Sequence, residues 1–240
     1  MNSLQINHRR EVYAWSAGIR IWHWIQVVVL IALGITGYLI ASPPASLGGE
    51  ASDHYRMGTI RFIHFASAYF LVIGFLFRVY LAIVGKPEAR EIFLPPVWRK
   101  DFWQGVWHEV RWYSFLEKKP NDYVGHNPLA MLGMHIGFVW VTVFMMVTGL
   151  ALYGEGTGMG TWQYEWFSSW VIPFFGQSQD VHTWHHLGMW MLLCFTINHI
   201  YLVVREDIMS GQTVMSSMIS GWRLNRDGRT PNEPEERRQG

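Results

Sequence analysis

Cysteine is nearly absent from the sequence, which excludes several kinds of site. The single residue, Cys194, cannot form an internal disulfide, a CxxC redox pair or a cysteine-ligated iron–sulfur cluster within this chain. No CxxCH motif is present either, so covalent c-type haem is excluded. The HExxH, Walker and GxGxxG motifs are also missing, and with them zinc-peptidase, nucleotide-hydrolysis and dinucleotide-binding functions.

Charged residues are few, at 15% of the chain, whereas half of the residues are hydrophobic. The 14 Trp and 14 Phe make the chain too apolar for an ordinary soluble domain. Apolar runs long enough to cross a hydrocarbon core of about 30 Å lie near 20–41, 60–84, 129–152 and 183–204. Lipid offers no partner for backbone polar groups, so each run must be a helix. We therefore expect an all-α polytopic membrane protein, a four-transmembrane-helix bundle that forms one domain over residues 1–240.

Two of the loops have almost no basic residues, and this asymmetry predicts the orientation of the chain. Residues 153–182 contain no Lys or Arg, and only Arg56 stands between the first two spans. Both termini and residues 85–128 are rich in basic residues. By the positive-inside rule these three segments are cytoplasmic, which predicts a multi-pass protein of the bacterial cytoplasmic (inner) membrane. The first apolar run has no small-residue cleavage pattern after it and is expected to remain as a span.

Aromatic residues recur in two of the loops. In the 85–128 loop, the near-helical spacing predicts an additional amphipathic helix at the cytoplasmic surface. Its apolar residues are Trp103, Trp107, Val110, Trp112 and Phe115. The 153–182 loop is rich in Gly, Trp and Phe. It either rests on the membrane or docks a partner, and the sequence leaves both alternatives open.

Histidines stand near both ends of the fourth span, and a histidine inside a membrane is energetically costly. Counting about 1.5 Å per residue from the cytoplasmic ends places His64 and His185 at one outer depth. The same count places His23 and His199 at one inner depth. On a helix, His185 and His199 lie within about 40° of one face and about 21 Å apart along the axis. His186 falls on nearly the opposite face from His199, about 220° away.

Paired histidines on facing membrane helices are the arrangement that ligates b-type haem, whose iron takes two axial imidazoles. We therefore predict two haem b groups, stacked across the bilayer. The alternative for each histidine is an interhelical hydrogen bond. In the third span, His135 is at inner depth and is a rival to His23 or His199. The roles of His182 and His186, near the outer surface, stay open.

Several charged residues lie at the inner ends of the spans. Arg20 and Arg205, beside Trp24 and Glu206, suit the propionates of an inner haem or a quinone, because cations favour carboxylates. The alternative is that they only anchor the helices at the interface. In the second span, Arg78 either snorkels to the inner surface or has an anionic partner inside the bundle.

Several stretches of the chain carry a family resemblance. They are RIWHW at 20–24, RFIHF at 61–65, PVWRKDFWQGVWHEVRWY at 96–113, GHNPLA at 125–130, and HTWHHLGMW with HIYLVVREDIMS within 182–210. Over about residues 12–222, the chain closely resembles the cytochrome b subunits of membrane-bound uptake NiFe-hydrogenases. WRKxxWQG and REDIMS are the most specific of these motifs.

The resemblance implies a di-haem subunit that anchors a periplasm-facing hydrogenase and has no hydrogen chemistry of its own. Electrons would pass from the iron–sulfur chain of the small subunit to membrane quinone. The expected partners are the small and large hydrogenase subunits, lipid and quinone, with no nucleic acid. Carried over by position, the haem ligands are His64 with His185 for the outer haem and His23 with His199 for the inner one. The alternatives are the cytochrome b subunit of a formate dehydrogenase or thiosulfate reductase, or a haem-free membrane anchor.

Overall fold

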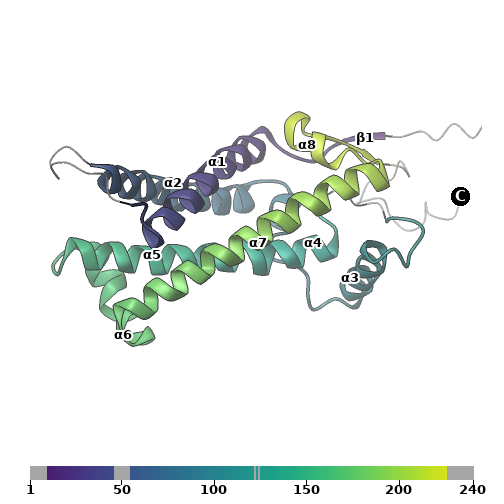
Figure 1. Cartoon of the computed structure of the whole chain (residues 1–240). Helices are drawn as coiled ribbons and strands as arrows, with labels where there is room; N and C mark the ends of the chain where they lie inside the picture. Colours follow the sequence, from purple (N-terminus) through teal and green to yellow (C-terminus); the bar gives the residue numbers. More distant parts are fainter. Residues whose placement is uncertain (1–9, 46–54, 122, 124, 226–240) are drawn as a thin grey trace, which may run out of the picture. The chain divides into compact units, whose positions relative to one another are not determined.

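The computed structural model describes residues 10–45, 55–121, 123 and 125–225. Several terminal arginines behind the orientation prediction lie outside the described residues, as does part of the loop between the first two spans. The elements, labelled in Figure 1 where space allows, are β1 Arg10–Tyr13, α1 Ala17–Ala41, α2 Arg56–Val84, the 3-10 turn η2 Pro87–Ala89, α3 Lys100–Tyr113, α4 Pro128–Gly133, the π-helix η3 Met134–Trp140, α5 Val141–Thr157, the π-helix η4 Tyr164–Ser168, α6 Ser169–Phe175, α7 Ser178–Ser210, α8 Val214–Ser220 and β2 Trp222–Asn225.

Four long apolar helical segments confirm the predicted fold class. They are Ala17–Ala41, Arg56–Val84, Pro128–Thr157 and Ser178–Ser210, and each contains one of the predicted runs. The third span is built from α4, η3 and α5 in succession. It begins where Asn127 accepts a hydrogen bond from the backbone N–H of Ala130 at 2.7 Å, with Pro128 at the first position. Within the described residues, each long helix therefore contains a predicted run and extends past it by at most six residues at either end.

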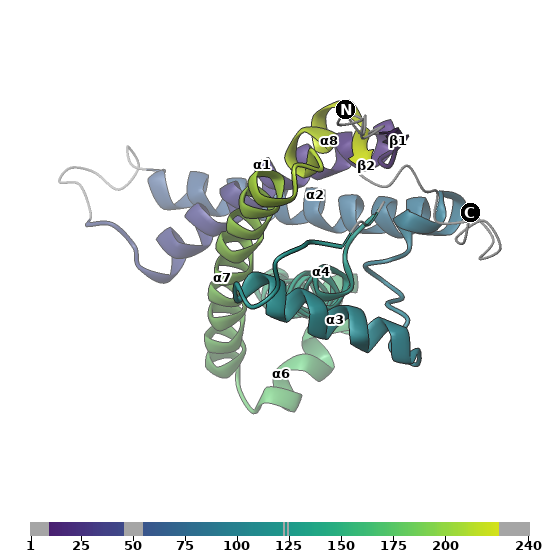
Figure 2. The same ribbon diagram turned by 90° about the vertical axis from the view of Figure 1, so that its right-hand side faces the viewer.

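The chain divides into two compact units, and the first consists of residues 1–21, 80–135 and 198–240. In this unit β1 pairs with β2 in antiparallel register, with Tyr13 opposite Trp222 (Figure 2). Trp15, Ile19 and Ala89 belong to a buried cluster of this unit. This antiparallel pairing thus joins the two ends of the described chain.

The amphipathic helix predicted in the 85–128 loop is present as α3, which belongs to the first unit. Trp103, Trp107 and Phe115 are exposed, as expected for an apolar face that lies against a membrane. Trp112 is different: it is 4% exposed, and its indole N–H donates to Glu206 at 2.9 Å. Its assignment to the surface face was wrong, because a residue nine positions after Trp103 is turned about 180° around a helix.

The second unit consists of residues 22–79 and 136–197. Its core cluster is the fully buried set Ala151, Val171 and Val181. The aromatic 153–182 loop folds into η4 and α6, and Ser168 ties it to α5 by donating to the Ala151 carbonyl at 2.6 Å. The face left exposed carries aromatic residues at four-residue intervals: Trp162, Trp166, Trp170 and Phe174. Such a face suits the membrane headgroup region.

Arg78 lies inside the second unit and is only 2% exposed. Its guanidinium lies 5.4 Å from the centre of the Trp22 ring, and the Trp22 N–H donates to the Gly74 carbonyl at 2.7 Å. An arginine held against an indole by a cation–π contact does not snorkel. Of the two alternatives, the structure therefore supports an interior environment for Arg78.

Candidate functional site

Two histidine–threonine pairs lie in the second unit. On α2, the His64 Nδ1 atom is 2.9 Å from the hydroxyl of Thr36 on α1. On α7, the His185 Nδ1 atom is 2.8 Å from the hydroxyl of Thr148 on α5. The two imidazoles are close enough to interact electrostatically with each other. The structure therefore brings together the two histidines that depth counting placed at the outer level.

The threonine hydroxyls determine which nitrogen of each histidine carries the proton. Thr36 Oγ1 lies 2.6 Å from the Ala32 carbonyl and Thr148 Oγ1 lies 2.8 Å from the Phe144 carbonyl. A carbonyl oxygen only accepts, so each hydroxyl proton goes to the carbonyl four residues earlier. The hydroxyl oxygen then accepts from the Nδ1–H of the histidine. The Nε2 atom keeps its lone pair, which is the donor that a haem iron needs.

A glycine follows each of these threonines and leaves room for the imidazole. A Cβ at Gly37 would lie 3.3 Å from Cε1 of His64, and a Cβ at Gly149 would lie 3.1 Å from Cε1 of His185. Both distances are shorter than ordinary van der Waals contacts, so a side chain here would press on the ring. We call Thr36–Gly37 and Thr148–Gly149 the Thr–Gly pairs.

The sequence reasoning missed the Thr–Gly pairs. Their signal is the dipeptide that recurs in ITGY at 35–38 and VTGL at 147–150, in the first and third spans. A Thr–Gly dipeptide is common in apolar helices, where small residues allow close packing. Only the tertiary contacts show that each one meets a histidine.

The other two histidines of the outer part of α7 bond within their own helix. His186 Nε2 accepts from the indole N–H of Trp190 at 2.9 Å. His182 Nδ1 donates to the Ser178 carbonyl at 3.0 Å. The ligand-type nitrogen of His186 is thus engaged by Trp190, which agrees with the helical-face argument that selected His185.

The inner histidines are divided between the units. His23 is half-buried on α1 in the second unit, with its ring edge-on to Trp24. His199 is half-buried on α7 in the first unit. Their pairing therefore stays a prediction. The rival ligand candidate, His135, is the second residue of η3, and its Nδ1 donates to the Ile92 carbonyl at 3.0 Å.

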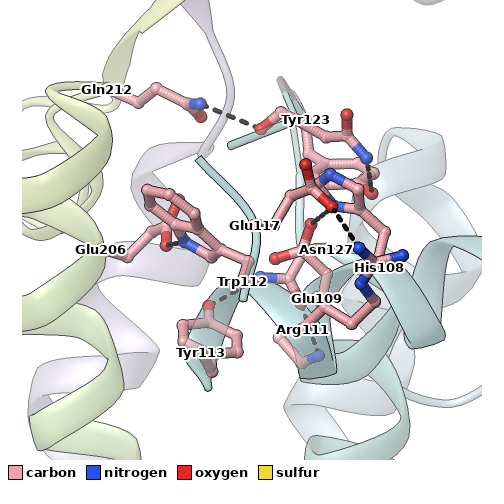
Figure 3. A network of polar contacts seen from close by, with 12 residues as sticks. His108, Glu109, Arg111, Trp112, Tyr113, Glu117, Tyr123, Asn127, Glu206 and Gln212 are labelled. Atoms are coloured by element: carbon pink, nitrogen blue, oxygen red, sulfur yellow. Dashed lines mark hydrogen bonds and ion pairs between the residues drawn. The ribbon is translucent and has the colours of Figure 1, made fainter. Parts of the chain in front are cut away.

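Figure 3 shows a polar network in the first unit that includes Trp112, Tyr113 and Glu206, and Arg205 of α7 contacts it at Trp112. Arg205 is 7% exposed and donates through Nη2 to the Trp112 carbonyl at 2.7 Å. The rings of Trp112, Tyr113 and Phe115 lie 4.7 to 5.1 Å from its guanidinium carbon. Its Nε and Nη1 atoms are buried and have no hydrogen-bond partner among the described residues. These two donors fit an anionic group such as a carboxylate.

Arg20, the other predicted cation, also lies in the first unit, where its Nη1 donates to the Ile219 carbonyl. This bond ties the start of α1 to α8. Whether Arg20 also contacts a cofactor stays a prediction. For Arg205, burial and unpartnered donors favour the cofactor-binding alternative.

Glu109 shares the network of Figure 3 and is 2% exposed. Burial raises the pKa of the Glu109 carboxyl, and the charge of Glu206 raises it further. A hydrogen bond with His108 at 3.3 Å lowers this pKa but does not cancel the effect of burial. Burial likewise raises the pKa of Tyr123 to about 12. Burial in this network therefore favours the neutral forms of Glu109 and Tyr123.

We expect the stability of the chain to depend on pH through Glu109. Its pKa is raised from 4.5, so the folded state binds the proton more tightly than the unfolded state does. Stability should fall as the pH rises from about 4.5 through the higher folded-state pKa. Glu109→Gln should flatten this dependence, by a few degrees in melting temperature, measured by thermal unfolding in detergent across this pH range.

The matched control for this experiment is Glu117→Gln. Glu117 is a partly exposed carboxylate that pairs with Arg111 at 3.4 Å. This variant should keep the pH dependence of the parent chain. A Glu109→Gln variant with the parent's slope would contradict the assignment.

Comparisons with known proteins agree with the geometry. The family model described as prokaryotic cytochrome b561 matches residues 14–221. A probable Ni/Fe-hydrogenase B-type cytochrome subunit of Azotobacter chroococcum mcd 1 is 55% identical over 225 residues, covering 94% of this chain and 93% of the relative. The Cupriavidus necator subunit of the same name is 50% identical over 218 residues, 91% of this chain and 89% of the relative.

A third relative, a probable Ni/Fe-hydrogenase 1 B-type cytochrome subunit of Escherichia coli K12, is 45% identical over 227 residues, 92% of this chain and 94% of the relative. In each case the match extends over nearly the full length of both chains. The chain therefore belongs to the prokaryotic cytochrome b561 family, in the group of the Ni/Fe-hydrogenase B-type cytochrome subunits, and is a membrane cytochrome b.

Proposed function

We propose that this chain is the electron-transfer anchor of a hydrogenase complex, with two b haems as carriers between the hydrogenase small subunit and the quinone pool. The observation that carries the proposal is the matched pair His64 and His185, each with Nδ1 held by a threonine and Nε2 left as a ligand. The names of the relatives support hydrogenase as the partner.

The outer haem site is assigned to His64 and His185. Each bound haem would supply a one-electron iron couple, and His64 with His185 would hold the iron of the outer haem. The protein's part is to hold the rings in place and to exclude water. Thr36 and Thr148 set the tautomer, and Gly37 with Gly149 leaves room beside the rings.

The inner haem site is assigned to His23 and His199. The support is their shared depth and the helical phase that places His185 and His199 within about 40° of one face. One helix, α7, would then contribute a ligand to each haem, about 21 Å apart along its axis. This spacing divides the crossing of the membrane into steps.

We assign Arg205 to an anionic group of the inner site, a haem propionate or a quinone oxygen. The buried Nε and Nη1 donors, unpartnered among the described residues, support this assignment. The distribution of basic residues supports a cytoplasmic location for both termini and residues 85–128 in an inner-membrane protein. The hydrogenase small and large subunits would then dock on the opposite, outer side.

The test is purification of the tagged chain from membranes of its own cells, without dissociating its partners. We expect two b haems per chain, a co-purifying large subunit that contains nickel, and reduction of the haems on addition of hydrogen. Reoxidation by an added quinone would establish the direction of transfer. The same preparation treated to remove the partner subunits serves as the control, since it should keep its haems and lose the response to hydrogen.

Other outcomes would contradict the proposal. A co-purifying subunit with a molybdopterin cofactor would assign the chain to a formate dehydrogenase or thiosulfate reductase. A spectrum without reduced b-type α bands would leave only a haem-free membrane anchor.

A further inference from the structure

The same arrangement of a threonine, the backbone carbonyl to which it donates, the following glycine and a histidine occurs twice in the second unit. A Thr–Gly pair on α1 meets His64 of α2, and a Thr–Gly pair on α5 meets His185 of α7. The hydroxyl–Nδ1 distances, 2.9 and 2.8 Å, are nearly equal, and so are the glycine–Cε1 distances, 3.3 and 3.1 Å. Two separate pairs of helices thus hold the two imidazoles in the same way.

The hydrogen bond from a threonine hydroxyl to the carbonyl four residues earlier is common in membrane helices. Thr196 on α7 shows this bond without a histidine beside it: it donates to the Leu192 carbonyl at 2.8 Å, and within the described part of the chain no imidazole bonds to its hydroxyl. Thr36 and Thr148 make the same backbone bond and also accept from a histidine. The imidazole is therefore the feature that distinguishes these two residues.

We propose that Thr36 and Thr148 are positioning residues that set the reduction potential of the outer haem. This inference rests on the haem ligation proposed above. A histidine ligand that donates its Nδ1–H to an acceptor is oriented by that bond and becomes a more basic ligand at Nε2. A more basic ligand stabilises ferric iron and so lowers the reduction potential.

The hydroxyl oxygen is a suitable acceptor because its own proton is already committed. Each threonine donates to a helix carbonyl, so its oxygen cannot turn to donate to the imidazole. The acceptor is also neutral, so no charge is buried in the apolar part of the bundle. Both axial ligands of one iron would receive the same support, one from each side.

The experiment uses the intact complex and replaces each threonine separately. Thr36→Val and Thr148→Val keep the shape of the side chain and remove the hydroxyl, whereas Thr36→Ser and Thr148→Ser keep the hydroxyl. Thr196→Val is the matched control for loss of a back-bonded hydroxyl. The measurements are haem content per chain, a redox titration of each haem, and the electron paramagnetic resonance signal of the ferric haems.

We expect each Val variant to keep two haems and to favour the reduced form of one haem about tenfold, a rise of ~59 mV for one electron. Both variants should shift the same haem and change the same resonance signal, because the two histidines share one iron. The Ser variants and Thr196→Val should keep the potentials of the parent complex. If a Val variant instead loses a haem, recovery of that haem in the Ser variant supports the proposal.

Three results would overturn the proposal. In the first, both Val variants titrate like Thr196→Val. In the second, the Ser variants shift the potential as much as the Val variants do, which would make shape rather than the hydroxyl responsible. In the third, haem is lost in the Val and Ser variants alike. A parent complex without b haem would overturn the proposed function itself, so the two failures are distinguishable.

Discussion

Replacing His185 with alanine is expected to lower the haem content from two to one per chain. Thr148 holds the Nδ1 atom of His185, which leaves the Nε2 lone pair of the imidazole to bind iron. Loss of His185 would remove one of the two imidazoles that hold the iron, and a methyl group cannot replace it. The measurement is haem per chain, from the absorbance of the reduced pyridine complex against protein concentration. His64→Ala should have the same effect, because it removes the opposite ligand of the same iron.

Two further variants make this prediction specific. His186→Ala should keep both haems, because the Nε2 atom of His186 accepts from Trp190 and does not face the site. The double variant His64→Ala with His185→Ala should still contain one haem, since both residues serve the same group. A double variant without any haem would show that the two histidines ligate different irons. An unchanged haem content in either single variant would contradict the ligand assignment directly.

Replacing His199 with alanine is expected to remove the other haem and to stop electron delivery to quinone. The oxidation of hydrogen with a soluble dye should continue, because that reaction takes place on the partner subunits. Hydrogen-dependent quinone reduction should fall by at least about a hundredfold, because loss of a direct ligand costs more than the roughly 10- to 100-fold loss seen for outer-shell partners of a metal site. The two activities are measured on the same membranes, so that their ratio corrects for expression.

The rival histidine of the third span provides the control. The Nδ1 atom of His135 donates to the Ile92 carbonyl in the turn after η2, a bond that explains a membrane histidine without a cofactor. His135→Ala should therefore keep both haems. Combining His199→Ala with His185→Ala should remove both, since α7 serves each haem. Loss of one haem in His135→Ala would show that His135 of η3, and not one of the proposed inner histidines, is a haem ligand.

Hydropathy was sufficient to predict the four spans, because the membrane requires about 20 apolar residues for each crossing. The predicted amphipathic helix was also confirmed as α3. The face of Trp112 was not predicted correctly. Near-helical spacing alone does not put it on the face of Trp103, because nine residues of helix turn it about 180° away. Whether the 153–182 loop rests on the membrane or docks a partner stays a prediction, although its internal contacts, such as Ser168 with Ala151, became visible in the structure.

The histidines were selected by depth and helical phase, two quantities that depend only on position along a regular helix. The sequence could also reject His186, because its face relative to His199 follows from the helical repeat. The environment of each histidine could not be predicted in this way. Arg205 is an example: its charge is visible in the sequence, but its burial among three aromatic rings is a tertiary fact.

The sequence by itself determined the membrane class of this protein, the number of its spans and the histidines that can face one interior. Each of these follows from a local periodicity or from the length of an apolar run, and lipid leaves the backbone no alternative to the helix. Only the tertiary structure decided that Thr36 and Thr148 meet His64 and His185. Such contacts depend on the relative rotation of two helices, and the many weak packing contacts that set this rotation are not encoded at any one position.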